Sequence, residues 1–428
     1  MTDEWEKRFS NLARRTLPPE ISWLMAQALE VPGLISLAAG FVDQDSLPNT
    51  SALQCLTGLL DNKVTGRAAL QYGTTQGDME LRRLLVQRLQ TEGVFHSGGS
   101  IDESHILITS GSQQLLYLAA EALLDEGDIV LVEAPTYFVV LGAFKTRGVR
   151  TIGIDIDEGG IIPERVEECL SELERRGEIG RVKMLYLMSY STNPTGITLA
   201  EERRKQIPDI IKRYRDRGIR ILLLEDAAYR RLCYDGPIPP PIKTYDIGNN
   251  MILYTESFSK SLSPGLRLGF GAGPKSLIDK MVDIKGNHDF GSSNLGQQIL
   301  KSFIGTKVYG EHVKMLHRIY ARKRDIALEL FENILPAEVK WIRPSGGLYI
   351  WITLPEGWDT GPKSDLFKRA MEEKVLYVPG CLCYSSDRPE SVLSSSLRIS
   401  YGMIDETHLR EGCERLGRAL AGSAPSVI

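Results

Sequence analysis

One lysine, Lys260, lies in a short segment that is rich in hydroxyl side chains. The segment reads Ser257-Phe258-Ser259-Lys260-Ser261-Leu262-Ser263-Pro264-Gly265-Leu266-Arg267. A lysine amine condenses with a carbonyl to form a Schiff base, and Ser257, Ser259 and Arg267 carry groups that bind a phosphate dianion. The segment therefore predicts a site that holds a phosphorylated aldehyde on Lys260. Taken alone, Ser-x-x-Lys also occurs in penicillin-binding proteins, and an isolated lysine is usually a surface residue.

Asp226 and Tyr229 follow an apolar run that ends at Leu224. Ligands bind at the carboxyl ends of strands in open α/β sheets. An aspartate there can pair with a protonated pyridine nitrogen, and a tyrosine can hydrogen-bond the ring's phenolic oxygen. A carboxylate after a strand is by itself more often a helix cap. Because Lys260 follows one predicted strand later, the ligand interpretation is favoured.

Three further segments carry groups that fit the same kind of ligand. Ser110-Gly111-Ser112-Gln113-Gln114 precedes a predicted helix, whose free N–H groups and dipole favour a phosphate. Tyr137 can stack on a planar ring. Asn193-Pro194-Thr195-Gly196 reads as a turn. Each signal is weak alone, since capped helices, tyrosines and turns are common.

Together these motifs resemble those of the class I and II aminotransferases, which depend on pyridoxal 5'-phosphate (PLP). The similarity is greatest to the group that contains 2-aminoadipate and kynurenine aminotransferases. It is carried by Tyr72-x-x-x-x-Gly77, Gly111-Ser112-Gln113-Gln114, Asn193-Pro194-Thr195-Gly196 and the Lys260 segment, in family order over nearly the whole chain. The resemblance implies fold type I, a homodimer and a lysine-bound PLP.

The resemblance also assigns roles to single residues. Lys260, Asp226 and Tyr229 are implied to be catalytic. The substrate's α-carboxylate is expected on Arg398, with further substrate contacts from Gly40 and Asn193. Many relatives have a second acid where this chain has Ala227, but the spacing from Asp226 to Tyr229 is kept. The residues implied to bind the cofactor are Tyr72 from a neighbouring subunit, Gly111, Ser112, Gln113, Tyr137, Asn193, Asp226, Tyr229, Ser257, Ser259, Lys260 and Arg267.

The predicted reaction moves an amino group from an L-amino acid to a 2-oxo acid, for which 2-oxoglutarate is the family's default. Lys260 forms the Schiff base and then moves the α-proton. Other PLP reactions, such as β-elimination or decarboxylation, use the same cofactor residues and remain open. Two less favoured alternatives are a PLP-binding protein without turnover and a transcriptional regulator with an aminotransferase-like domain. The regulator needs a DNA-binding module, which the residues before the matched region do not resemble.

The composition excludes several kinds of partner. The chain has 428 residues and a formal net charge of -4, so no overall basic field is available for nucleic acid or an anionic membrane. Neither a secretory signal nor a membrane-spanning stretch is evident. The six cysteines and six histidines form no metal-ligand spacing, so we expect reduced thiols, no metal and a cytoplasmic protein.

The elements that position these residues are predicted from hydrophobic patterns. Apolar runs at 105–109, 129–132, 184–188, 221–224 and 251–255 read as strands buried on both faces. Helices are expected at 112–124 and 199–216 between them. This alternation predicts an α/β fold with a mainly parallel sheet flanked by helices, which is fold type I, in a large PLP-binding domain at 65–305.

A second, smaller α+β domain is predicted at 306–428, joined by an N-terminal segment at 1–64. A long helix at 308–333 leads into strands at 341–343, 346–352 and 397–401, with helices at 364–373 and 406–421.

The amino donor is predicted from the N-terminal segment. Relatives that use acidic amino acids can have a basic residue where this chain has Trp23, and the loop after Gly40 reads Phe41-Val42-Asp43 where many relatives have proline. We therefore expect a bulky apolar or aromatic donor, with glutamate and 2-oxoglutarate tolerated as the other pair. Arg14 or Arg15 remains an alternative source of charge, and Trp23 is equally compatible with a core position.

Overall fold

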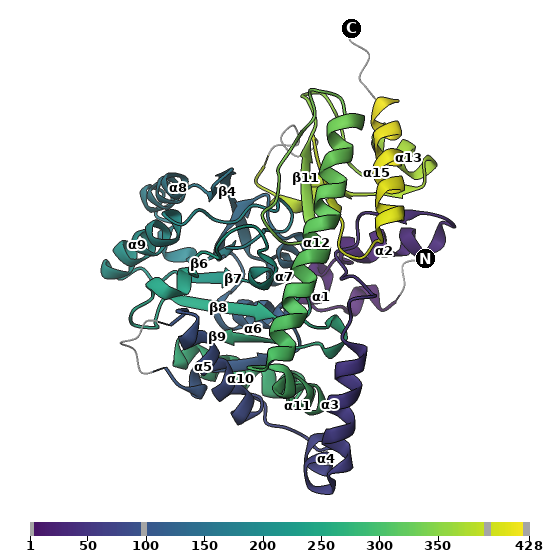
Figure 1. The fold of residues 1–428 in the computed structure, drawn as a ribbon. Helices are drawn as coiled ribbons and strands as arrows, with labels where there is room; N and C mark the ends of the chain where they lie inside the picture. The colour runs from purple at the N-terminus through teal and green to yellow at the C-terminus, as the bar shows by residue number, and fades with distance from the viewer. Residues whose placement is uncertain (1–3, 96–100, 389–394, 423–428) are drawn as a thin grey trace.

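The computed structural model describes residues 4–95, 101–388 and 395–422. Its largest element is an eight-stranded sheet with the order β2-β9-β8-β7-β6-β3-β4-β5 (Figure 1). The inner neighbours β4, β3, β6, β7 and β8 run parallel, whereas β9 is antiparallel to both β2 and β8. The strands are β2 Ile106–Thr109, β3 Ile129–Ala134, β4 Arg150–Asp157, β5 Gly160–Ile161, β6 Val182–Met188, β7 Leu222–Asp226, β8 Ile252–Ser257 and β9 Gly269–Ala272.

Helices cover both faces of this sheet, which confirms the predicted fold class. Side chains of α6, α7 and α10 pack on one face, while those of α8 and α9 pack on the other. Strands β3 and β8 are buried throughout, as their unbroken apolar runs predict, and β6 is buried except at Lys183. The helices are α5 Met79–Thr91, α6 Ser112–Leu123, α7 Phe138–Arg147, α8 Pro163–Arg175, α9 Arg203–Asp216, α10 Lys275–His288 and α11 Asn294–Phe303.

The C-terminal part forms a separate four-stranded antiparallel sheet with the order β10-β11-β14-β13. The long helix α12 runs from the large sheet to this smaller one, beside α15 (Figure 1). The elements are α12 Lys307–Ile334, β10 Lys340–Trp341, β11 Tyr349–Thr353, α13 Asp365–Glu372, β12 Val375–Leu376, β13 Val378–Pro379, β14 Ser396–Ser400 and α15 Glu406–Ala421.

The N-terminal residues contact both parts of the molecule. Strand β1 (Ile35–Ser36) pairs with β12, and Trp23 of α2 (Glu20–Glu30) stacks on Phe367 of α13 with ring centroids 5.6 Å apart. In contrast, α1 (Asn11–Arg15) contacts α7, and α3 (Asn49–Asp61) and α4 (Lys63–Leu70) contact α11. The domain bounds at 64/65 and 305/306 stay a prediction.

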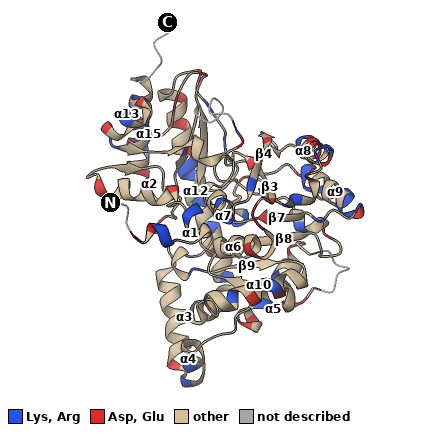
Figure 2. Ribbon diagram, turned by 180° about the vertical axis from the view of Figure 1, so that it is seen from behind, with Lys and Arg blue, Asp and Glu red and all other residues tan. Residues whose placement is uncertain are grey.

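Charged side chains of both signs alternate over the outer helices. Figure 2 shows lysine and arginine interspersed with aspartate and glutamate on α8 and α9. Arg213 of α9 pairs with Glu167 of α8, and Arg217 after α9 pairs with Glu174. Within the described ranges, no helix is both long and apolar enough to cross a membrane.

Candidate active site

A cavity of about 250 Å³ opens at the carboxyl ends of the central strands. Every residue predicted to bind cofactor or substrate lines it except Tyr72. These are Gly40, Gly111, Ser112, Gln113, Tyr137, Asn193, Asp226, Tyr229, Ser257, Ser259, Lys260, Arg267 and Arg398. The cavity therefore joins segments from both sheets and from the N-terminal region.

Lys260 lies on the connection between β8 and β9. Its Nζ donates to the carbonyl oxygen of Gly40 at 2.6 Å. Burial, with smaller contributions from the nearby cations Arg398 and Arg267, lowers the pKa of Lys260 from 10.5 to about 8. The amine therefore comes close to the neutral, nucleophilic form at physiological pH.

Asp226 is the last residue of β7 and is almost fully buried. Its carboxylate accepts hydrogen bonds from the Ala228 N–H at 3.0 Å and the Tyr186 hydroxyl at 3.1 Å. Burial outweighs these two bonds and raises the pKa of Asp226 from 3.8 to about 6. No described residue forms an ion pair with this carboxylate, so it can accept a cation from the cavity.

The phosphate-binding segment is held close to Arg267. Helix α6 begins at Ser112, directly after Gly111, whose φ of +79° favours glycine. A Cβ atom at Gly111 would lie 3.1 Å from an Arg267 guanidinium nitrogen, so the missing side chain also permits this approach. The side-chain amide of Gln113 is buried against the cavity without a hydrogen-bond partner. Helix N-terminus, guanidinium and free amide together form a cradle for an anion.

Arg398 on β14 lies in the same cavity and is almost fully buried. It donates to the Asn193 side-chain oxygen at 2.7 Å and to the Ala38 carbonyl oxygen at 2.5 Å. Its Nε is buried and has no hydrogen-bond partner. Arg398 therefore has a free donor.

Tyr72 is placed differently from the other predicted residues. It is 82% exposed and lies edge-on to Phe290, with ring centroids 5.7 Å apart. It does not line the cavity of its own chain.

Tyr349 lines the cavity and was not identified from the sequence. It begins β11, directly after Gly346-Gly347-Leu348, and its hydroxyl lies 2.8 Å from that of Tyr229. The glycine pair before a strand at the site was a usable signal. The side-chain partner is 120 residues away along the chain and could not be read from spacing.

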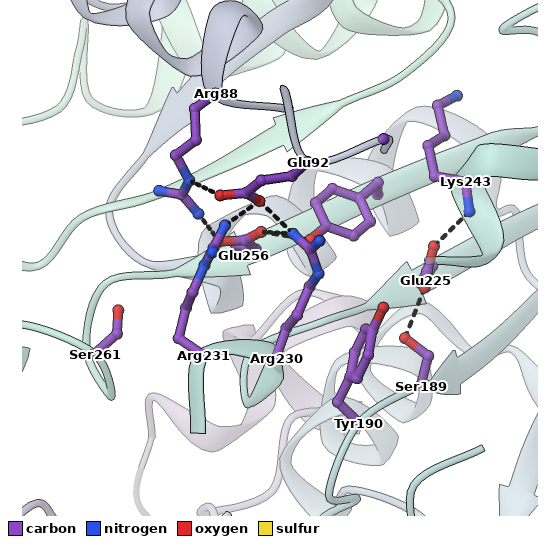
Figure 3. A network of polar contacts seen from close by, with 12 residues as sticks. Arg88, Glu92, Ser189, Tyr190, Glu225, Arg230, Arg231, Lys243, Glu256 and Ser261 are labelled. Atoms are coloured by element: carbon purple, nitrogen blue, oxygen red, sulfur yellow. Dashed lines mark hydrogen bonds and ion pairs between the residues drawn. The ribbon is translucent and has the colours of Figure 1, made fainter. Parts of the chain in front are cut away.

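Figure 3 shows an ionic network in which Glu256 and Arg230 are next in sequence to the cavity residues Ser257 and Tyr229. Glu256 precedes Ser257 and pairs with Arg88, Arg230 and Arg231. Glu92 pairs with the same three arginines, and its oxygen lies 2.6 Å from Arg230. The arginines hold the pKa of Glu256 below its usual range despite burial.

The chain is similar to known proteins over most of its length. Residues 32–416 match the family model described as aminotransferase class I and II. The aromatic-amino-acid aminotransferase 1 of Thermococcus litoralis is 32% identical, over 98% of this chain and 95% of that protein. The 2-aminoadipate transaminase of Thermus thermophilus is 31% identical, over 98% of each chain. A Pyrococcus horikoshii kynurenine aminotransferase, solved with PMP and kynurenine, superposes with a TM-score of 0.90 at 32% identity over 99% of each chain.

Proposed function

The chain belongs to the class I and II aminotransferases and is an enzyme of amino-group transfer, and from this premise we propose that its cavity works with PLP held on Lys260. The observation that carries the proposal is the meeting of Lys260, Asp226 and Arg398 in one cavity. These supply an amine, an acid for a ring nitrogen and a carboxylate clamp.

The residues present fit PLP. Asp226 is a buried carboxylate without a cationic partner in the described chain, which suits a pyridinium nitrogen. The α6 N-terminus, Gln113 and Arg267 suit the phosphate, together with the hydroxyls of Ser257 and Ser259. Bound there, PLP would supply an aldehyde that takes up the amino group and a ring that draws electrons from the substrate's α-carbon.

The protein's own residues have three tasks in this proposal. Arg398 binds the substrate α-carboxylate and, with Asn193, fixes the orientation of the α-carbon. The Lys260 amine, with its pKa lowered to about 8, takes the α-proton of the substrate as a base and gives the proton up again as an acid when the amino group has moved. Tyr229 and Asn193 donate to the phenolic oxygen of the ring.

We propose a homodimer in which Tyr72 completes the neighbouring subunit's cavity. Tyr72 and Phe290 are 82% and 60% exposed and form one aromatic patch. Exposed aromatic pairs of this kind are typical of interfaces. Sedimentation equilibrium of the wild type and Tyr72→Asp tests the assembly, and a monomeric wild type would contradict it.

We propose a donor with a bulky apolar or aromatic side chain and 2-oxoglutarate as acceptor. Ile21, Phe41 and Val139 form an apolar part of the cavity lining. Trp23 does not line it and instead stacks on Phe367. Neither alternative arginine lines it: Arg15 pairs with Glu126, and Arg14 donates to the Lys7 carbonyl. The described lining therefore has no cation besides Lys260, Arg267 and Arg398.

A half-reaction screen tests both parts of this proposal. The PLP-loaded protein is mixed with each amino acid, and the change in cofactor absorbance and the released acid are measured together. A 2-oxo acid formed in equal amount to the cofactor supports transamination, whereas ammonia or CO₂ indicates elimination or decarboxylation. If glutamate or 2-aminoadipate exceeds leucine, methionine, phenylalanine and kynurenine by more than about tenfold in rate over dissociation constant, or about 1.4 kcal/mol, the apolar-donor proposal fails.

A further inference from the structure

Tyr349 connects two functional groups that come from different parts of the fold. It is 2% exposed at the start of β11. Its hydroxyl lies 2.8 Å from the hydroxyl of Tyr229, and the two rings meet edge to face with centroids 5.6 Å apart. Tyr229 follows β7 of the large sheet, so this contact joins the small sheet to the cofactor side of the cavity.

The ring face of Tyr349 packs on Arg398. The guanidinium carbon lies 4.3 Å from the ring centroid, within the range of a cation–π contact. The strand register explains this proximity, because Arg398 pairs with Trp351 and Tyr349 lies two residues before Trp351 on the same face. Arg398 is thus held by its hydrogen bonds to Asn193 and Ala38 and by the Tyr349 ring, which is nearer to the guanidinium than the Phe138 ring at 5.7 Å.

The Tyr349 hydroxyl also occupies space that exists because residue 40 is glycine. A Cβ atom on Gly40 would lie 2.3 Å from the Tyr349 oxygen. The Gly40 carbonyl accepts the hydrogen bond of Lys260. The Tyr349 side chain thus contacts three parts of the site. These are the backbone of Gly40, which binds Lys260, the hydroxyl of Tyr229 and the guanidinium of Arg398.

We propose that Tyr349 is a positioning residue that couples the Arg398 clamp to the Tyr229 hydroxyl. This inference rests on the roles proposed for Arg398 and Tyr229. A phenol carries one proton, so Tyr229 can donate it into the cavity only if Tyr349 is the donor of the hydroxyl pair. Donation from Tyr349 also polarises Tyr229 and strengthens its own donation. Tyr349 then acts through two other residues: its hydroxyl sets the donor strength of Tyr229, and its ring sets the angle of Arg398.

Two substitutions separate these effects in the PLP-loaded protein. Tyr349→Phe removes the hydroxyl and keeps the ring, whereas Tyr349→Leu removes both. The first measurement is the pH midpoint of the visible absorbance of the bound cofactor. The second is the apparent dissociation constant and limiting rate constant of the half-reaction with the best donor. The third is the thermal unfolding of the cofactor-free variants, which detects a general loss of packing.

The molecule contains a matched control away from the cavity. Tyr234 forms a hydroxyl pair with Tyr401 at 2.6 Å, and its ring lies 5.0 Å from the guanidinium carbon of Arg324. It therefore repeats the tyrosine–tyrosine–arginine arrangement without lining the active-site cavity. Tyr234→Phe is expected to leave the absorbance midpoint and the dissociation constant unchanged.

For Tyr349→Phe we expect the pH midpoint of the cofactor absorbance to rise by about half a pH unit. The reason is that the cofactor's phenolic oxygen then accepts a weaker hydrogen bond from Tyr229 and keeps its proton to higher pH. The affinity for the amino-acid substrate should change by less than about twofold, since the ring remains on Arg398. For Tyr349→Leu we expect the same rise in midpoint and about tenfold weaker donor binding, with a smaller change in the limiting rate constant.

Three results would overturn the inference. A midpoint that stays or falls in Tyr349→Phe would show that Tyr349 does not donate to Tyr229. Unchanged donor affinity in Tyr349→Leu would remove the ring from the positioning of Arg398. Equal shifts in Tyr234→Phe would assign the effect to general packing. In each case a wild type that still releases one 2-oxo acid per cofactor leaves the proposed function standing.

Discussion

Two neighbouring groups of buried charges differ in how completely they are neutralised. In the ionic network, Glu92 and Glu256 each contact all three arginines, and burial accompanies a lowered pKa for Glu256. In the cavity, Lys260 and Asp226 have no ion-pair partner in the described chain, and burial moves both pKa values toward neutrality. Burial alone therefore does not distinguish a structural charge from a functional one. The distinguishing feature is an unpaired charge that faces a cavity.

The functional role of an unpaired charge in the cavity should be most evident for Lys260→Ala. We expect turnover to fall by more than about a thousandfold, because the nucleophile and the proton-transfer group are lost together. The fold and phosphate binding should persist, since Ser112, Ser257 and Arg267 remain. Steady-state turnover, circular dichroism and cofactor binding check this. Borohydride trapping of the cofactor on another lysine would contradict the assignment.

Glu256→Gln should lower the stability of the fold and largely keep turnover, which is the opposite of Lys260→Ala. Breaking a buried charge network leaves guanidinium groups uncompensated, so the free energy of unfolding should fall by about 3 kcal/mol. Turnover per folded molecule should change much less than in Lys260→Ala. Chemical denaturation of both proteins measures the loss.

The control is Glu172→Gln, which removes a partly exposed glutamate that also contacts two arginines, Arg175 and Arg176. We expect no measurable change in its unfolding. Equal losses in Glu172→Gln and Glu256→Gln would remove the special status of the buried network.

Asp226→Asn tests the unpaired acid. A neutral amide cannot stabilise a protonated ring nitrogen, so we expect the rate constant for α-proton abstraction to fall by about a hundredfold while the cofactor stays bound. A deuterium isotope effect on the α-proton, measured in single-turnover experiments, locates the loss in the chemical step. A normal rate constant for this step would remove Asp226 from its proposed role.

The smallest expected effect is on the pH dependence of unfolding of the cofactor-free protein. Asp226 has a raised pKa, so its stabilising protonated form is fully present below about pH 4 and is lost as the pH rises to about 6. Lys260 has a lowered pKa, so the unfolded chain binds more protons between about pH 8 and 10.5, and stability rises over that interval.

Each of these two pH intervals is tested by its own variant. Asp226→Asn should remove the slope between about pH 4 and 6, and Lys260→Met should remove the slope between about pH 8 and 10.5. Difference curves between variant and wild type isolate them from the other titrating groups. Parallel curves over these intervals would show that the two pKa values are not shifted.

Much of the fold could be predicted because its signals are local. The unbroken apolar run at 184–188 and the long helix predicted at 308–333 correspond to β6 and α12, with small changes at their ends. The helix predicted from residue 199 begins instead at Arg203, and the N–H of Leu199 donates to the carbonyl oxygen of Ser189 in the connection after β6. Helix starts of this kind depend on tertiary hydrogen bonds that the sequence pattern does not contain.

The candidate site was predictable where motifs carry it and not where contacts are distant. Lys260, Asp226 and Asn193 stand in short motifs, and the structure brings them together. The hydroxyl pair of Tyr229 and Tyr349 and the pairing of Arg88 with Glu256 join residues far apart in the chain, with no short motif to mark them. The role of Tyr72 stays a prediction, since one chain does not test a contact between two.

The cavity lining contains three cations, Lys260, Arg267 and Arg398, against the single acid Asp226. Such a site concentrates small anions from solution. An anion that binds the folded chain but not the unfolded chain stabilises the fold by mass action. The melting temperature of the cofactor-free protein should therefore rise with the concentration of inorganic phosphate. At a hundred times its dissociation constant, phosphate would add about 2.7 kcal/mol. The choice of buffer thus sets both the baseline stability of the apoprotein and the competition that PLP must overcome to load.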